Sequence, residues 1–118
     1  MNDEPKISNA IIVDVKLCLE GHGLLTAFIM LDYDDGLVQG FGGYNCYLPN
    51  QNNNLYSYAG RFIYRSMEVA GVSDWSQMVG KSVRAKSTQS KVTAIGHITR
   101  NDWFDPSADF ATYKENRS

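Results

Sequence analysis

Arginine and histidine side chains carry most of the chemistry that this sequence offers. Arg61 and Arg65 are four residues apart, which places both guanidinium groups on one face of a helix. Such a pair can hold phosphate or carboxylate groups through charge-assisted bonds, or it can form a solvated face on which Glu68 balances Arg65. His97 and Arg100 follow near the end of an alternating apolar segment. A packed, hydrogen-bonded histidine and a ligand contact are the two interpretations of His97.

Catalysis requires more than isolated polar residues. A general base needs a partner group and a cleft. The sequence has two histidines and two cysteines, with no serine nucleophile elbow, no HExxH pattern and no Cys/His cluster at zinc spacing. We therefore expect no enzymatic activity, no metal site and no cofactor.

The stretch GFGGYN at residues 40–45 places three glycines in four positions at the end of an apolar run. It is not a GxGxxG pattern and no helix follows directly, so a dinucleotide or phosphate loop is excluded. One interpretation is a bend or bulge that aids packing. The other is a bare backbone surface for a ligand or partner, formed by Gly42 and Gly43 between Phe41 and Tyr44.

The segment NDWFDP at residues 101–106 places Trp103 and Phe104 among acidic residues. These aromatic side chains either pack back onto the edge of a sheet or form an exposed anchor for a partner. The neighbouring carboxylates, together with those of residues 32–35, are candidates for a surface that imitates phosphate groups and occupies a nucleic-acid groove on another protein.

Length and composition indicate one ordinary globular domain. The chain has 118 residues, of which 43% are hydrophobic and 20% charged, and its formal net charge is −2. A mildly acidic chain is not typical of nucleic-acid-binding proteins. The polar start is unlike a secretory signal, and no apolar run is long enough to span a bilayer. We expect a single domain over residues 1–118, with a core from about 8 to 110, frayed ends and a cytosolic location.

The hydrophobic periodicity predicts an α+β fold. Strands are predicted at 11–20, 24–33, 37–44, 81–87 and 92–99, and helical patterns at 58–70 and 74–78. In the first strand the apolar face contains Ile11, Val13, Val15, Leu17 and Leu19. We expect an antiparallel five-stranded sheet in the order βββ-αα-ββ, packed by one main helix and one short helix.

Four motifs taken together resemble a known family. Residues 20–26 (EGHGLLT), 40–44 (GFGGY), 68–75 (EVAGVSDW) and 94–106 (AIGH to WFDP) occur in this order in small proteins encoded by bacteriophages and prophages. The resemblance covers roughly residues 8 to 110. The chain departs from the family pattern at two places. Glu20 precedes Gly-His-Gly, whereas the family usually has an acid directly before His-Gly, and residues 51–54 replace a more charged insert.

The resemblance implies a phage or prophage origin, for a family of no settled activity. Small accessory phage proteins often act against host defences. By association, the resemblance suggests a counter-defence protein in the host cytoplasm. Such a protein would bind and inhibit a defence protein or ribonucleoprotein complex, in the manner of an anti-CRISPR. One alternative is a sponge for a cyclic or adenine-containing nucleotide, with Phe41, Tyr44 or Trp103 stacked on the base and Arg61, Arg65 or Arg100 on the phosphates. Another is a structural protein that forms a homo-oligomer through a sheet edge.

Overall fold

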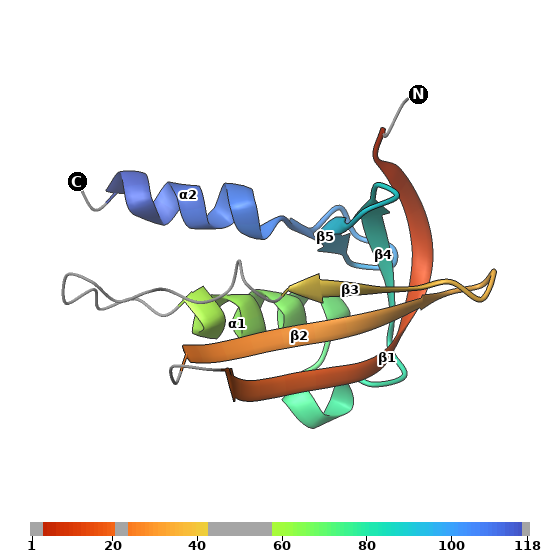
Figure 1. Ribbon diagram of the computed structural model, residues 1–118, viewed down its shortest axis with the longest axis horizontal. Coiled ribbons are helices and arrows are strands. Elements are labelled where there is room, and N and C mark those ends of the chain that lie inside the picture. The colour runs from red at the N-terminus through yellow and green to blue at the C-terminus, as the bar shows by residue number, and fades with distance from the viewer. Residues whose placement is uncertain (1–3, 21–23, 43–57, 117–118) are drawn as a thin grey trace.

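The computed structural model describes residues 4–20, 24–42 and 58–116, and its architecture is an antiparallel sheet with helices (Figure 1). The sheet has six strands in the order β3-β2-β1-β4-β5-β6. The strands are β1 (Lys6–Glu20), β2 (Leu24–Tyr33), β3 (Val38–Gly42), β4 (Ser82–Ser87), β5 (Val92–Gly96) and β6 (Trp103–Phe104). The helices are α1 (Tyr58–Ala70), the short 3₁₀ helix η3 (Trp75–Gln77) and α2 (Pro106–Asn116).

The predicted fold class is confirmed at the level of an α+β fold with an antiparallel sheet, but the predicted count of five strands is wrong. Trp103–Phe104 forms a sixth strand that pairs with β5. The prediction of one main helix and one short helix is also wrong, because Pro106–Asn116 forms α2, a second α-helix of 11 residues. Asp105 caps the N-terminus of α2, since its side-chain Oδ1 accepts a bond from the Ala108 N–H at 3.3 Å.

The second helical segment is shorter than predicted. It is a 3₁₀ turn over Trp75–Gln77, and Asp74 is its N-cap, with the Asp74 side chain accepting a bond from the Ser76 N–H. The main helix matches its predicted bounds of 58–70. Gly71 ends it with a φ of 78°, and its N–H donates to the Met67 carbonyl at 2.9 Å.

A β-bulge in β1 corrects the predicted buried face of that strand. The register against β2 shifts between Ile12 and Asp14. One extra residue reverses the side-chain alternation, so Ile12 is fully buried before the bulge while Ile11 and Val13 remain exposed. After the bulge Val15 packs against the core as predicted. Leu17 and Leu19, which were predicted on the same buried face, are 48% and 71% exposed, so the prediction is wrong for these two residues.

The core lies between the inner face of the sheet and α1. We call the side that carries Ile12, Ile29 and Val83 the inner face, because these three side chains are fully buried. Phe62 and Val69 of α1 are likewise fully buried against it. Ser66 of α1 is also buried, a position that the apolar stripe of the helix did not predict.

The sheet is strongly curled. The long β1 curves so that its first half pairs with β4 and its second half with β2 (Figure 1). As a result β3 comes into contact with β5, although three strands lie between them in the sheet order. The Gln39 side-chain amide of β3 donates to the Thr88 carbonyl at 3.2 Å, at the start of the β4–β5 turn. The two ends of the sheet therefore approach one another like the two edges of an open barrel.

Gly42 shows what the glycine-rich stretch requires. Its φ is +113°, a conformation that residues with a Cβ rarely adopt. A Cβ at this position would lie 2.7 Å from the Ala27 carbonyl oxygen and 2.8 Å from Phe62 Cζ. The close approach of α1 to the end of β3 therefore requires glycine here. Gly43 and Tyr44, which were predicted as contact residues, lie outside the described residues.

Candidate functional site

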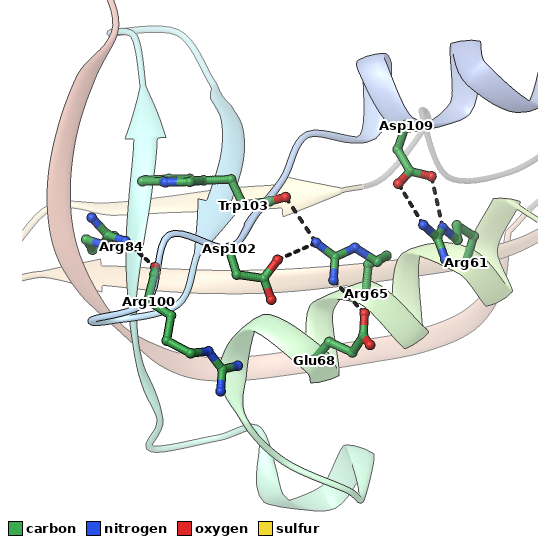
Figure 2. A network of polar contacts seen from close by, with 8 residues as sticks. All are labelled: Arg61, Arg65, Glu68, Arg84, Arg100, Asp102, Trp103 and Asp109. Carbon is green, nitrogen blue, oxygen red and sulfur yellow. Dashed lines mark hydrogen bonds and ion pairs between the residues drawn. The ribbon is translucent and has the colours of Figure 1, made fainter.

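The two helix arginines form ion pairs that join α1 to the C-terminal part of the chain (Figure 2). Arg61 binds Asp109 of α2 in a bidentate arrangement, with Nε to Oδ1 at 2.9 Å and Nη2 to Oδ2 at 3.0 Å. Arg65 Nη2 donates to Asp102 Oδ1 at 2.8 Å and to the Trp103 carbonyl at 3.0 Å. Both guanidinium groups thus bind carboxylates of this chain, an arrangement that matches the fork geometry of arginine.

Arg65 is the more buried of the two, with only 13% of its side chain exposed. Burial lowers the pKa of its guanidinium, but the hydrogen bonds with Asp102 and Glu68 outweigh this effect and leave the pKa raised above its ordinary value. The guanidinium also lies 5.8 Å from the centre of the Phe104 ring. Arg65 is therefore a fixed positive charge that positions β6 against α1.

His97 organises the turn between β5 and β6. Its Nδ1 accepts bonds from the backbone N–H of Thr99 at 3.1 Å and of Arg100 at 2.9 Å. In this arrangement Nδ1 carries no proton, so the ring is in the tautomer with its hydrogen on Nε2. Arg84 supports the same turn, because its Nε donates to the His97 carbonyl. Its Nη2 donates to the Arg100 carbonyl (Figure 2).

Trp103 lies flat on the outer face of the sheet. A Cβ on Gly96 would be 2.6 Å from the indole Cδ2, so the missing side chain is what lets the ring approach the backbone. The Arg84 guanidinium is 4.9 Å and the Lys86 ammonium 5.3 Å from the ring centre. Such cation–π contacts stabilise the ring by about 0.5–1 kcal/mol each at partly exposed sites. The ring remains partly exposed.

Phe41 and Phe104, also predicted as contact residues, belong to the core. Each is 1% exposed. Their ring centres lie 6.1 Å apart in an edge-to-face arrangement, and both rings contact Phe62. The predicted contact residues that the structure describes are thus divided among the core, an ion-pair network, a turn and the outer face of the sheet, and they do not meet in one cleft.

A different surface is open to a partner, namely the outer face of β1, β2 and β3. We define the outer patch as the apolar side chains on this face: Ile11, Val13, Phe28, Met30 and Val38. Ile11, Val13 and Val38 are 44%, 43% and 49% exposed. The Phe28 ring lies over Gly40 of β3, at the position a Cβ would occupy. Within the described part of the chain, the buried residues of α1 and α2 pack on the inner side, away from this patch.

Carboxylates surround the outer patch. Asp32 lies between Ile11 and Val38 in the strand register, and Asp14 pairs with Met30. Asp34 and Asp35 follow in the exposed β2–β3 turn. Sequence reasoning noted some of these acids but missed the patch, because Ile11 and Val13 alternate as a buried face would. A bulge in the middle of an alternating strand leaves little signal in the sequence.

No group of three or more His, Cys, Asp and Glu residues that could hold a metal ion is found in the residues the structure describes. None of the described helices is long and apolar enough to cross a membrane. No protein-family model, no curated protein and no solved structure matches the chain. A proposal of function therefore depends on the geometry of the described residues and on the sequence motifs.

Proposed function

We propose that this chain is a non-enzymatic phage or prophage protein that binds a host defence protein or ribonucleoprotein complex and inhibits it. The outer patch is the contact surface. The observation that carries the proposal is the exposed apolar face of β1, β2 and β3, from which the helices of the described chain are absent. Contiguous exposed apolar side chains with a polar rim are typical of interaction sites.

The connectivity supports a binding role for this face. The connectivity has the arrangement of an OB-type barrel. The bent first strand is shared by both halves of the sheet, a helix lies between β3 and β4, and β5 approaches β3. Proteins with such barrels bind oligonucleotides and oligosaccharides on the face of the second and third strands. This analogy of fold concerns the location of the site and says nothing of the ligand.

The charges around the patch favour a protein partner over a nucleic acid. Asp14, Asp32, Asp34 and Asp35 lie on or beside it, while Lys16 is the cation next to Phe28 in the register. Phosphate groups would be repelled by this set of charges. A basic groove that normally holds nucleic acid would be attracted, and apolar contacts would then hold the complex together. The nucleic-acid channel of a CRISPR effector is such a surface.

The test uses purified protein and purified CRISPR effector–guide complexes from the host. We expect the native chain to inhibit target cleavage and Ile11→Lys to weaken inhibition at least about tenfold, because the substitution places a cation in the centre of the contact. Tyr64→Lys is the matched control, since Tyr64 is 57% exposed but lies on α1. Inhibition by Tyr64→Lys should equal that of the native chain.

Two results would contradict this proposal. One is unchanged cleavage by every effector tested with the native chain. The other is a stable dimer in light scattering that dissociates on Ile11→Lys, because the outer patch would then join two copies of this chain and would not be free to bind a host protein.

A further inference from the structure

A second site lies at the end of the curled sheet that is remote from α1. There the structure contains a cavity of about 490 Å³, a volume within the range of small-molecule pockets. It is lined by the start of β1, the end of β2, the start of β3 and the end of β4, and by the turns β2–β3 and β4–β5. None of the residues predicted from the sequence as contact residues lines it.

The lining of this cavity is a layer of polar side chains inside the sheet. On each of four strands, the side chains that face inward are apolar along most of the strand and become polar near this end of the sheet. The polar side chains that meet there are Ser8, Tyr33, Gln39 and Ser87. Ser87 is only 7% exposed. A packed core would place apolar side chains at such positions, so this layer departs from what the stability of the sheet alone requires.

Hydrogen bonds hold part of this layer in a fixed geometry. The Tyr33 hydroxyl donates to Gln39 Oε1 at 2.7 Å. The Gln39 Nε2 donates to the carbonyls of Thr88 and Gln89, so one side chain joins β2, β3 and the β4–β5 turn. The hydroxyls of Ser8 and Ser87 take part in no hydrogen bond with another described residue. They remain able to bond a ligand.

The cavity has two chemically different sides. Tyr33 and Leu37 offer an aromatic and apolar surface, and Ser8 and Ser87 offer hydroxyl groups. A flat ring with a polar edge fits between such sides.

Charged side chains at the rim limit the charge of the ligand. Lys6 lies across from Ser87 in the strand register and forms no ion pair with another described residue. Glu4 and Asp35 also line the rim. One ammonium group can hold one phosphate, whereas two nearby carboxylates disfavour a polyphosphate chain.

We propose that this cavity binds a nucleoside or a nucleoside monophosphate, with the base against Tyr33 and the sugar hydroxyls toward Ser8 and Ser87. Lys6 binds the phosphate when one is present. Val38 lines the cavity and also belongs to the outer patch, but the two sites have no other residue in common. The cavity differs from the arginine site that the sequence suggested for a nucleotide, because Arg61 and Arg65 already bind carboxylates. The proposal goes beyond the inhibitor function and does not depend on it.

The test is calorimetric titration of the full chain with adenosine, AMP and ATP, together with amide chemical shifts. We expect adenosine and AMP to bind and ATP to bind at least about tenfold more weakly than AMP. Shift changes should cluster at Ser8, Tyr33, Gln39 and Ser87. No binding of any of the three up to millimolar concentration, or shift changes confined to other residues, would overturn the proposal.

Matched serine variants on one strand provide the control. Ser87→Leu fills the cavity and should weaken AMP binding at least about tenfold, whereas Ser82→Leu on the exposed outer face of β4 should leave it unchanged. If Ser87→Leu does not fold, Tyr33→Phe removes one lining hydroxyl with little change in volume and should weaken binding by a smaller factor. AMP affinity that is the same in Ser87→Leu or Tyr33→Phe as in the native chain would refute the site. Ile11→Lys should still bind AMP and Ser87→Leu should still inhibit an effector, so the two proposals can fail separately.

Discussion

Phe104 provides the sharpest test of how the C-terminal segment is held. Its ring is 1% exposed, and it contacts the rings of Phe41, Phe62 and Phe110 at centroid distances of 6.1, 5.6 and 6.3 Å. It thus joins β3, α1, β6 and α2 in one aromatic cluster. Phe104→Ala would remove the shared ring and leave a cavity at the centre of that cluster.

The expected loss of stability follows from the buried area. An aromatic side chain buries about 150 Å² or more, and at about 25 cal/mol per Å² its removal costs about 4 kcal/mol. This agrees with the range of about 3–5 kcal/mol for Phe→Ala substitutions in cores. The ring-to-ring contacts place the expected value in the upper half of that range.

Urea denaturation followed by far-UV circular dichroism measures this loss as a decrease in the free energy of unfolding. Trp103→Ala is the neighbouring control, because Trp103 lies on the outer face and is partly exposed, so we expect a loss of only about 1–2 kcal/mol. If Phe104→Ala costs less than about 1 kcal/mol, or less than Trp103→Ala, then β6 is not anchored through Phe104 and the account of the cluster is wrong.

Two further predictions concern charged groups. In a double-mutant cycle of Arg65→Met and Asp102→Asn, we expect a coupling free energy of about 1 kcal/mol. The Arg65 side chain is only 13% exposed, but the Asp102 side chain is 34% exposed, so solvent weakens the ion pair. A coupling free energy of zero would show that the pair does not hold β6 to α1. Hydrogen bonds from the Ser76 hydroxyl and, to a smaller extent, from the Ser76 N–H lower the pKa of Asp74 from the ordinary value of 3.8. Asp74 therefore stabilises the fold above that pH. This contribution is lost as the pH falls through the lower pKa of the folded state. An NMR titration of the Asp74 carboxyl should have its midpoint below 3.8, and Asp74→Asn should remove this part of the pH dependence of stability; a midpoint at or above 3.8 would refute it.

Local patterns in the sequence determined much of the scaffold. The stripe containing Phe62 and Met67 predicted α1 with its observed bounds, and Gly71 marked its end. The alternation of Val83 and Ala85 with Arg84 predicted β4 and its buried side. Helix periodicity, strand alternation and glycine caps depend on neighbours in the chain, and for this reason they can be read without knowing the tertiary structure.

The location of the candidate sites was decided by long-range contacts. The sequence offers Arg61 and Arg65 as phosphate ligands, but Asp109 and Asp102, which lie 48 and 37 residues away in the chain, bind them in the folded protein. The approach of these carboxylates depends on β6 pairing with β5, a pairing of only two residues that has no periodicity to detect.

The bulge in β1 and the curl of the sheet had the largest consequences. A shift of one residue exposes Ile11 and Val13 while keeping Ile12 buried, because side chains alternate with a period of two along a strand. The curl brings Gln39 to the β4–β5 turn and creates the polar cavity. The sequence alone therefore determined five of the strands and the main helix, but neither β6 nor α2. The tertiary structure decided which side chains face a partner, because this depends on strand register and on contacts between residues far apart in the chain.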